Sequence, residues 1–345
     1  MKSILSTIAL CILFNLAYGQ RKTENVILIT FDGMRWQEIF GGADSSMFRQ
    51  QEHLKDSRLK IKYWRDNIGE RRKALMPFFW TTIASGGQLY GNRIAGSKAN
   101  VTNNQWFSYP GYNEILTGKA DNENIHSNDK FYNPNTTVLE FFNAQPGFKG
   151  KVAAFTSWDV FPYIINDKRS GVMVSGGMVP ATGGKLTQKE QTMNELMPVL
   201  PNPLGDVRLD AFTFQYGFEY LKKNRPRVMY FSFDETDDFA HEGEYGAYLN
   251  SAHNTDAFIA ELWNFIQTDS KYKDKTTLLI TCDHGRGTNS TEWKSHGAKI
   301  SESDQIWCAV LGPDTPATGE MNLKELILLC LSRVRVFALP EKEIH

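Results

Sequence analysis

Residues 26–33 read VILITFDG, an unbroken apolar run that ends in an aspartate and a glycine. A run that is apolar throughout, rather than at every second position, is typical of a strand buried on both faces of a parallel sheet. Four other short runs have the same character, and they cover residues 152–156, 228–233, 277–282 and 306–311. We therefore predict a sheet of buried parallel strands.

Stretches with helical spacing lie between these runs. Residues 210–223 and 245–267 place apolar side chains three and four residues apart, as one face of a helix requires. The alternation of strands and helices predicts a doubly wound α/β fold, in which helices cover both faces of a mostly parallel sheet. Residues 41–75 are charged and polar, and we expect them to form a helix or an excursion over the active-site edge.

The size and charge of the chain limit its organisation and its partners. A length of 345 residues allows one large domain or two small ones. There is no internal repeat and no low-complexity linker, so we predict that residues 21–345 form one catalytic domain with loop insertions. The net charge of −1 gives no electrostatic reason to expect a nucleic-acid duplex as a partner.

The first twenty residues have the layout of a secretory signal peptide. Lys2 supplies a positive charge, residues 4–16 are almost entirely apolar, and small residues follow at Ala17 and Gly19. The alternative is a membrane anchor, but the apolar run is shorter than the roughly 20 residues that span a bilayer. We therefore expect cleavage near Gly19, export to the periplasm or the medium, and no membrane span in the mature chain.

Carboxylate and imidazole side chains follow several of the predicted strands. The carboxyl ends of parallel strands meet at one edge of a sheet, where open α/β sheets bind their ligands. Two of these side chains are four residues apart, so a helical turn would place them on one face. Mixed Asp and His ligands suit Zn²⁺, while sites richer in oxygen also accept Mn²⁺ or Mg²⁺. The candidate ligands are Asp32, Asp237, His241, Asp283, His284 and His296.

Each candidate alone also has an ordinary structural explanation. An aspartate after a strand often caps a helix or a turn, and this reading applies to Asp32. Asp237 lies among other acidic residues, which a solvated face would also carry. The combination favours a metal site, because independent caps would not also supply histidines at three matching places. We give His253, in the middle of a predicted helix, a structural role.

The order of these motifs resembles the alkaline phosphatase superfamily, especially its nucleotide pyrophosphatase/phosphodiesterase-like and phosphoglycerate-mutase-like branches. The resemblance covers roughly residues 25–312 and rests on Phe-Asp-Gly, Ser-Tyr-Pro, Asp-x-x-x-His, Asp-His-Gly and His-Gly, which begin at residues 31, 108, 237, 283 and 296. It implies an alkaline phosphatase-like fold with two divalent metal ions. One ion would be held by Asp237, His241 and His296. The other would be held by Asp32, Asp283 and His284, with the Ser108 oxygen as a further ligand.

The resemblance also implies the roles of two catalytic residues. Ser108 matches the nucleophile, which would form a phosphoseryl intermediate. A serine hydroxyl is a poor nucleophile at neutral pH, and metal coordination would stabilise its alkoxide. Asn128 matches the position of an asparagine that donates to a phosphate oxygen, although the intervening loop differs and Asn124 is close by.

We therefore expect an exported two-metal hydrolase that acts on a small-molecule phosphate monoester or diester. A phosphotransferase or mutase would use the same phosphoserine with another acceptor. A sulfatase is disfavoured, because the segment from Ser108 to Tyr112 lacks the arginine of the sulfatase signature. A metal-binding protein without turnover is a further alternative, against which the complete set of ligands argues.

The charge of the substrate depends on side chains around the metal core. Cationic contacts to the phosphoryl oxygens favour a dianionic monoester, and Arg35, Lys98 and Arg286 are near the motifs in sequence. An apolar groove would instead accept the second ester group of a diester. Aromatic residues that could line such a groove, or simply pack in the core, are Trp36, Trp106, Phe107, Tyr109 and Tyr112. The sequence does not choose between these substrates.

Overall fold

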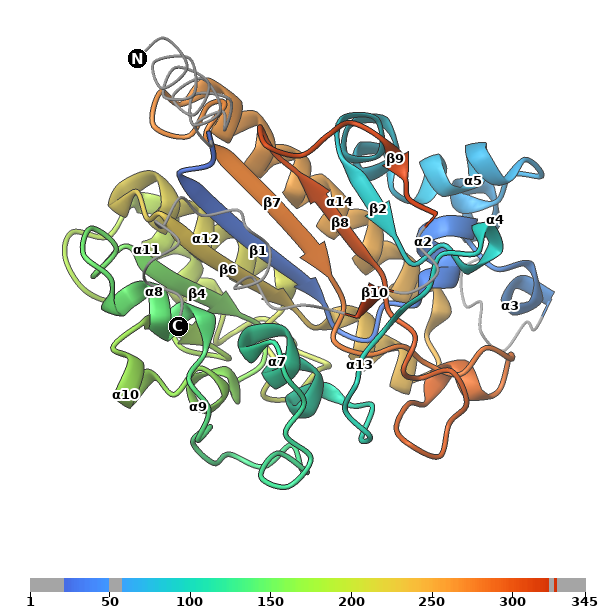
Figure 1. Cartoon of the computed structure of the whole chain (residues 1–345), viewed down its shortest axis with the longest axis horizontal. Helices are drawn as coiled ribbons and strands as arrows, with labels where there is room; N and C mark the ends of the chain where they lie inside the picture. Colours follow the sequence, from blue (N-terminus) through green and yellow to red (C-terminus); the bar gives the residue numbers. More distant parts are fainter. Residues whose placement is uncertain (1–21, 50–57, 323–325, 328–345) are drawn as a thin grey trace, which may run out of the picture.

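The computed structural model describes residues 22–49, 58–322 and 326–327 (Figure 1). Within these residues the main sheet has eight strands in the order β5-β4-β6-β1-β7-β8-β2-β9. The five strands from β5 to β7 are parallel. The predicted α/β fold with a mostly parallel sheet is confirmed. The strand bounds are β1 Asn25–Phe31, β2 Gln88–Tyr90, β3 Ala99–Asn100, β4 Val152–Thr156, β5 Met173–Gly176, β6 Val228–Phe233, β7 Thr276–Thr281, β8 Cys308–Leu311, β9 Gly319–Glu320 and β10 Leu326–Ile327.

Helices and helical turns connect these strands. The α-helices are α2 Trp36–Gly41, α3 Ser45–Arg49, α4 Arg58–Tyr63, α5 Ile68–Leu75, α6 Ala84–Gly86, α7 Ser108–Thr117, α8 Val138–Ala144, α9 Phe161–Ile164, α10 Asp167–Ser170, α11 Gln188–Leu196, α12 Asp210–Asn224, α13 Glu235–His241 and α14 Tyr245–Thr268. A π-helical turn, η2 Phe79–Ile83, and two 3₁₀ turns, η3 Arg93–Ala95 and η4 Glu292–Lys294, are also present. Both long helices expected from the sequence, α12 and α14, lie within one residue of their predicted bounds at either end.

The last predicted strand runs in the opposite direction from the prediction. β8 pairs with β7 antiparallel, with Thr281 opposite Cys308. A parallel strand needs a crossover, usually a helix, whereas the segment between β7 and β8 contains only the single turn η4. β2 then pairs antiparallel with β8. The sheet therefore has a parallel centre and a mixed edge.

Helices cover both faces of the sheet, as the prediction requires. Phe231 of β6 packs against Phe214 of α12, with ring centroids 6.1 Å apart. Tyr230, the preceding residue, packs against Phe161 of α9 at 5.6 Å. Because successive side chains of a strand point to opposite faces, α12 and α9 lie on opposite sides of the sheet. α14 packs beside α12 and α7 beside α9 (Figure 1).

Within the polar segment at residues 41–75, the described helices α4 and α5 pack against α14. Leu59 of α4 contacts Gly246 near the start of α14. At the end of α5, the Leu75 carbonyl lies 2.7 Å from Nδ1 of His253, in keeping with a structural role for this histidine.

The expected signal peptide at residues 1–20 lies outside the described residues. Among the helices that the structure describes, none has the length and hydropathy of a membrane-spanning segment.

The register of the central strands decides where the candidate ligands emerge. β1 lies between β6 and β7, with Phe31 opposite Phe233 and Thr30 opposite Thr281. The three strands therefore end at the same level. The residues that follow them, including Asp32 and Asp283, leave the sheet at one edge.

Candidate metal centre and active site

Asp32, Asp283 and His284 form a buried cluster at this edge, which we call the inner site. Asp32 is 2% exposed, and Asp283 and His284 are fully buried. Nε2 of His284 lies 3.4 Å from Oδ1 of Asp32 and 3.4 Å from Oδ2 of Asp283. One ligand atom from each residue therefore points to a common centre.

The atoms that face this centre are suited to a cation. In the described part of the chain, Asp32 Oδ1, Asp283 Oδ2 and His284 Nε2 are buried without a hydrogen-bond partner. Nδ1 of His284 lies 2.9 Å from the carbonyl oxygen of Gly285. A carbonyl only accepts, so Nδ1 carries the proton and Nε2 presents a lone pair to two carboxylates. A divalent cation would make this arrangement favourable, so these residues fit a metal ion.

The other oxygen of each inner carboxylate is held by the protein. Tyr112 donates its hydroxyl to Oδ2 of Asp32 over 2.8 Å, and the Gly33 amide donates to Oδ1 of Asp283 over 3.1 Å. Burial and the nearby charge of Asp237 raise the pKa of Asp32 to about 8. Burial and the charge of Asp32 also raise the pKa of Asp283 well above its ordinary value. A bound cation would favour the ionised forms, so metal binding would release protons.

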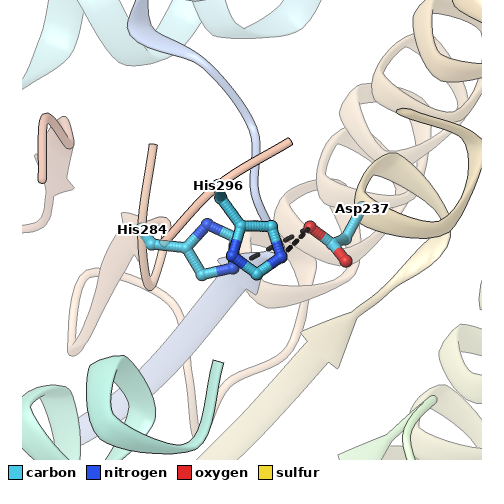
Figure 2. A group of neighbouring side chains, drawn as sticks. All are labelled: Asp237, His284 and His296. Carbon is cyan, nitrogen blue, oxygen red and sulfur yellow. Dashed lines mark ion pairs between the residues drawn. The ribbon is translucent and has the colours of Figure 1, made fainter. Parts of the chain in front are cut away.

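Asp237, His241 and His296 form a second, more accessible cluster beside the first, which we call the outer site. Nε2 of His241 lies 3.1 Å from Oδ2 of Asp237 and 2.9 Å from Nε2 of His296. The side chain of His241 is 44% exposed, so solvent reaches this cluster. Figure 2 shows the rings of His284 and His296 directed at Asp237, whose Oδ1 lies 3.8 and 3.7 Å from their Nε2 atoms. The two sites are therefore adjacent, with His284 next to both.

Protonation differs between the residues of the outer site and the neighbouring His284. Burial would lower the pKa of His241, but its hydrogen bond to Asp237 and the charge of that carboxylate raise it. Burial alone would raise the pKa of Asp237, but the positive charge of Arg286 and the nearby histidines hold it well below its ordinary value. Burial lowers the pKa of His284 to about 4 and that of His296 to about 2. Both imidazoles are therefore neutral at pH 7, as metal ligation requires. Nδ1 of His296 lies 3.3 Å from the Trp106 carbonyl, which leaves the lone pair on Nε2, the atom that faces Nε2 of His241.

Ser108 begins α7 on the helical face that contacts the inner site. Gly111, three residues later, packs so closely that an added Cβ would lie 2.3 Å from the carbonyl oxygen of Asp283. Tyr112, four residues later, binds Asp32. Because positions i, i+3 and i+4 share one face of a helix, Ser108 lies on this same face. Its side chain sits at the amino end of the helix, where the helix dipole favours an anion.

Asn128 lies beside Ser108, and Asn124 does not share this contact. Oδ1 of Asn128 accepts a hydrogen bond of 2.9 Å from the backbone amide of Tyr109. The side chain of Asn124 is instead bonded to the carboxylate of Asp121, at 3.0 and 3.1 Å. The structure therefore brings Asn128, rather than its neighbour, to the start of α7.

Two arginines suggested as substrate contacts are occupied elsewhere. Arg35 is fully buried, and its guanidinium binds the Glu38 carboxylate and the Gly287 carbonyl, the latter over 3.1 Å. Arg286 is 1% exposed and binds Asp237 over 2.5 Å. The suggestion that these two groups contact phosphoryl oxygens is wrong, because neither is available to a substrate. Lys98 is exposed.

The sequence did not reveal the roles of three residues that support the metal centre. Tyr112 holds Asp32, Gly111 allows α7 to approach Asp283, and Gly33 allows the backbone to approach Asp237. The helical spacing from Ser108 would have found the first two, since they lie three and four residues further along the same face. Gly33 has a φ of +57°, and a Cβ there would lie 2.4 Å from Oδ1 of Asp237.

Comparisons with known proteins agree with this geometry. The family model described as type I phosphodiesterase / nucleotide pyrophosphatase matches residues 97–303. The lipoteichoic acid synthase LtaP from Listeria monocytogenes has a similar structure, with a TM-score of 0.54 and 11% identity over 89% of this chain and 70% of that chain. Ps i-CgsB has a TM-score of 0.54 and 12% identity over 90% and 70%. A phosphonate monoester hydrolase of Agrobacterium radiobacter has a TM-score of 0.50 and 11% identity over 88% and 71%.

At these identities the structural similarities show a shared fold. The comparison with curated proteins found no match.

Proposed function

The chain belongs to the type I phosphodiesterase / nucleotide pyrophosphatase family of phosphoester hydrolases, and on this basis we propose that it hydrolyses phosphodiesters with Ser108 as the nucleophile and two divalent metal ions. The observation that carries the proposal is that the inner cluster contacts the helical face that begins with Ser108, while the outer cluster adjoins the inner one at His284. The resemblance noted in the sequence implies the same nucleophile and two metal ions, and it leaves the choice between monoester and diester open.

The residues divide the chemistry between them. When bound, the two metal ions would stabilise the Ser108 alkoxide, neutralise charge on the phosphoryl and leaving oxygens, and lower the pKa of the attacking water. Oγ of Ser108 attacks phosphorus, and the bond from phosphorus to the leaving alcohol breaks. Water then attacks the phosphoserine, which restores the serine and releases the second product. Oδ1 of Asn128 accepts from the Tyr109 amide, which supports a role for Nδ2 as the donor to a phosphoryl oxygen.

The engaged arginines support a diester over a monoester. A dianionic monoester is best bound by additional cationic side chains, and a diester carries only one negative charge. Arg35 and Arg286 are both buried and hydrogen-bonded to other parts of the protein. Neither supplies the extra charge that a monoester would need. The family description points in the same direction.

We propose Zn²⁺ as the native metal. The two clusters together supply three imidazoles and three carboxylates, a mixture that suits zinc better than magnesium or calcium. Mn²⁺ and Mg²⁺ are the alternatives to test.

We also propose that the enzyme is exported through the signal sequence in residues 1–20. The charge at Lys2 and the apolar run at residues 4–16 support this proposal. Expression of the full chain in a bacterial host and sequencing of the mature amino terminus would test it. An uncleaved protein in the cytoplasm would overturn it.

The activity is tested on purified protein stripped of metal by a chelator. Bis(nitrophenyl) phosphate, nitrophenyl phosphate and nitrophenyl sulfate are then offered with Zn²⁺, Mn²⁺ or Mg²⁺ restored. We expect metal-dependent hydrolysis with the diester as the best substrate, and its loss in Ser108→Ala. Full activity in Ser108→Ala would show that Ser108 is not the nucleophile. Preference for the sulfate ester would show that the enzyme is not a phosphoester hydrolase. Transfer of the phosphoryl group to an added alcohol in place of water would favour a phosphotransferase.

A further inference from the structure

Arg286 joins three segments of the metal centre through one buried guanidinium. Nη1 donates to Oδ1 of Asp237 over 2.5 Å. Nε donates to the carbonyl of Trp293, and Nη2 to the carbonyl of Lys294, both over 3.0 Å. Arg286 itself follows the inner ligands Asp283 and His284 in sequence. A single side chain thus connects the segment after β7, the first turn of α13 and the loop around η4.

This connection fixes the outer site, whose ligands come from two of these segments. Asp237 and His241 lie on α13, whereas His296 follows Lys294 by two residues. The loop is closed on the other side by a hydrogen bond of 3.1 Å from the Gly287 amide to the Ser295 carbonyl. The position of His296 relative to α13 therefore depends on the bonds of the Arg286 guanidinium.

Arg286 also orients the carboxylate of Asp237. It binds Oδ1, while Oδ2 lies 3.1 Å from Nε2 of His241. The backbone of Gly33 packs against this same contact, so closely that a Cβ would lie 2.4 Å from Oδ1 and 3.1 Å from Nη1. The carboxylate is held in one orientation and offers Oδ2 as a directed ligand.

We propose that Arg286 is a positioning residue that preorganises the outer site of Asp237, His241 and His296, so that its loss weakens the outer metal selectively. The inference rests on the proposed two-metal function. Residues that orient metal ligands typically contribute about 10- to 100-fold in metal affinity. The inner carboxylates accept their own hydrogen bonds from the Tyr112 hydroxyl and the Gly33 amide, and the guanidinium donates to neither carboxylate.

A simple charge argument predicts the opposite effect. A buried cation repels a divalent ion, so removal of the Arg286 charge alone would strengthen metal binding at the outer site. We favour positioning because the charge is already paired with Asp237 and because the guanidinium also binds two backbone carbonyls. The sign of the affinity change separates the two explanations.

The test measures metal binding on the full-length mature protein. Zn²⁺ is titrated in competition with a chromophoric chelator, and bound metal is counted after equilibrium dialysis. The variants are Arg286→Met, which keeps the volume without charge, and Arg286→Lys, which keeps the charge without the planar fork. The control is Arg208→Lys, since Arg208 is equally buried and binds the Thr156 and Ser175 carbonyls at 2.9 and 3.0 Å without touching a ligand.

We expect two zinc ions per wild-type chain. In both Arg286 variants the outer ion should bind about 10- to 100-fold more weakly, and the inner ion should be unchanged. The Arg208→Lys control should keep both affinities. If Arg286→Met does not fold, Arg286→Lys carries the test, because it leaves no uncompensated charge beside Asp237.

Three results would overturn the inference. Tighter outer binding would show that Arg286 acts through repulsion. Equal weakening of both ions would show general loosening of the fold. If the wild type binds two ions and the Arg286 variants bind both with unchanged affinity, Arg286 does not position the metal ligands, and the proposed function is unaffected. A wild type that binds a single ion would instead remove the two-metal proposal, and the inference with it.

Discussion

Tyr112 of α7 donates its hydroxyl to Oδ2 of Asp32, at the end of β1, over 2.8 Å. Both residues are buried, and the bond joins the helix of the proposed nucleophile to a proposed metal ligand. The remaining oxygen, Oδ1, faces Nε2 of His284 at 3.4 Å. The hydroxyl therefore leaves Oδ1 of Asp32 as the oxygen available to a metal ion. It also fixes α7, which begins at Ser108, against this ligand.

Tyr112→Phe should weaken metal binding at the inner site. The ring would still pack against Phe161, at a centroid distance of 4.6 Å, so the change removes mainly the hydroxyl. We expect about a 10- to 100-fold loss of inner metal affinity. We also expect a loss of about 1–3 kcal/mol in the free energy of unfolding, because Asp32 loses a buried donor. Zinc competition and denaturant unfolding measure the two effects.

Tyr109→Phe is the matched control on the same helix. Its hydroxyl donates to the Phe131 carbonyl over 2.8 Å and contacts no ligand. We expect a stability loss of similar size with unchanged zinc affinity. Weaker zinc binding in this variant as well would mean that α7 is being loosened as a whole.

Gly111→Ala should displace α7 from the metal centre. The new methyl group would lie 2.3 Å from the Asp283 carbonyl oxygen, a backbone atom, so either α7 or the backbone at Asp283 must shift. Overpacking of this kind typically costs about 1–3 kcal/mol. Since Ser108 lies one turn away, kcat should fall together with the unfolding free energy.

Gly41→Ala provides the comparison for this substitution. Nothing lies within 4 Å of a Cβ added at Gly41, near the end of α2. An alanine there should leave activity unchanged and keep or slightly raise stability. If Gly111→Ala behaves in the same way, the close approach of α7 to Asp283 is not required.

The ligand positions were predictable because they depend on local features. Each central strand is a continuous apolar run, and parallel strands in register end together. Asp32 and Asp283 follow β1 and β7 directly enough to be placed by that rule alone. By contrast, the direction of β8 depends on its connection to β7, which no apolar run reveals. The short strand β5 escaped prediction because Met173, its first residue, is 39% exposed.

The roles of the arginines could not be predicted for a different reason. A charged residue beside a catalytic motif suggests a contact with the substrate, and Arg35 and Arg286 were both considered as substrate contacts for this reason. Their actual partners include Gly287 and Asp237, which are 252 and 49 residues away in the chain. Such partners come together only in the folded protein. The folded structure is also needed to show that the two guanidinium groups are buried and unavailable to a substrate.

The stability of metal-free protein should fall as pH rises from about 6.5 to 8. Burial, together with the charge of Asp237, raises the pKa of Asp32 from 3.8 to about 8. The folded state therefore holds a proton that the unfolded state has lost, and this contribution disappears as pH rises through the folded pKa. His284, with a pKa lowered to about 4, works in the opposite direction, but only below its ordinary value of 6.5.

Added zinc should reverse this dependence. A bound cation replaces the proton on Asp32, so the stabilisation gained from zinc should grow between pH 6.5 and 8. Thermal unfolding with and without Zn²⁺ across this range measures the gain. A gain that is constant with pH would mean that Asp32 is already ionised in the metal-free protein.

Asn128→Ala should lower kcat with little change in metal binding. The side chain accepts from the Tyr109 amide through Oδ1, so Nδ2 is the atom that would donate to the substrate. Loss of one such donor typically lowers kcat by about 10²- to 10³-fold, because the stabilised charge develops in the transition state. Steady-state kinetics with the diester and a parallel zinc titration would separate this effect from loss of metal.

Two further variants identify the atom responsible. Asn128→Asp keeps an oxygen for the Tyr109 amide but loses the donor, so its kcat should fall at least as far as in Asn128→Ala. Asn124→Ala, which removes a side chain that is hydrogen-bonded to Asp121, should keep wild-type kinetics. If Asn128→Asp retained wild-type kcat, the residue would be acting only as a cap for α7. Donation to the phosphoryl group would then have to come from elsewhere.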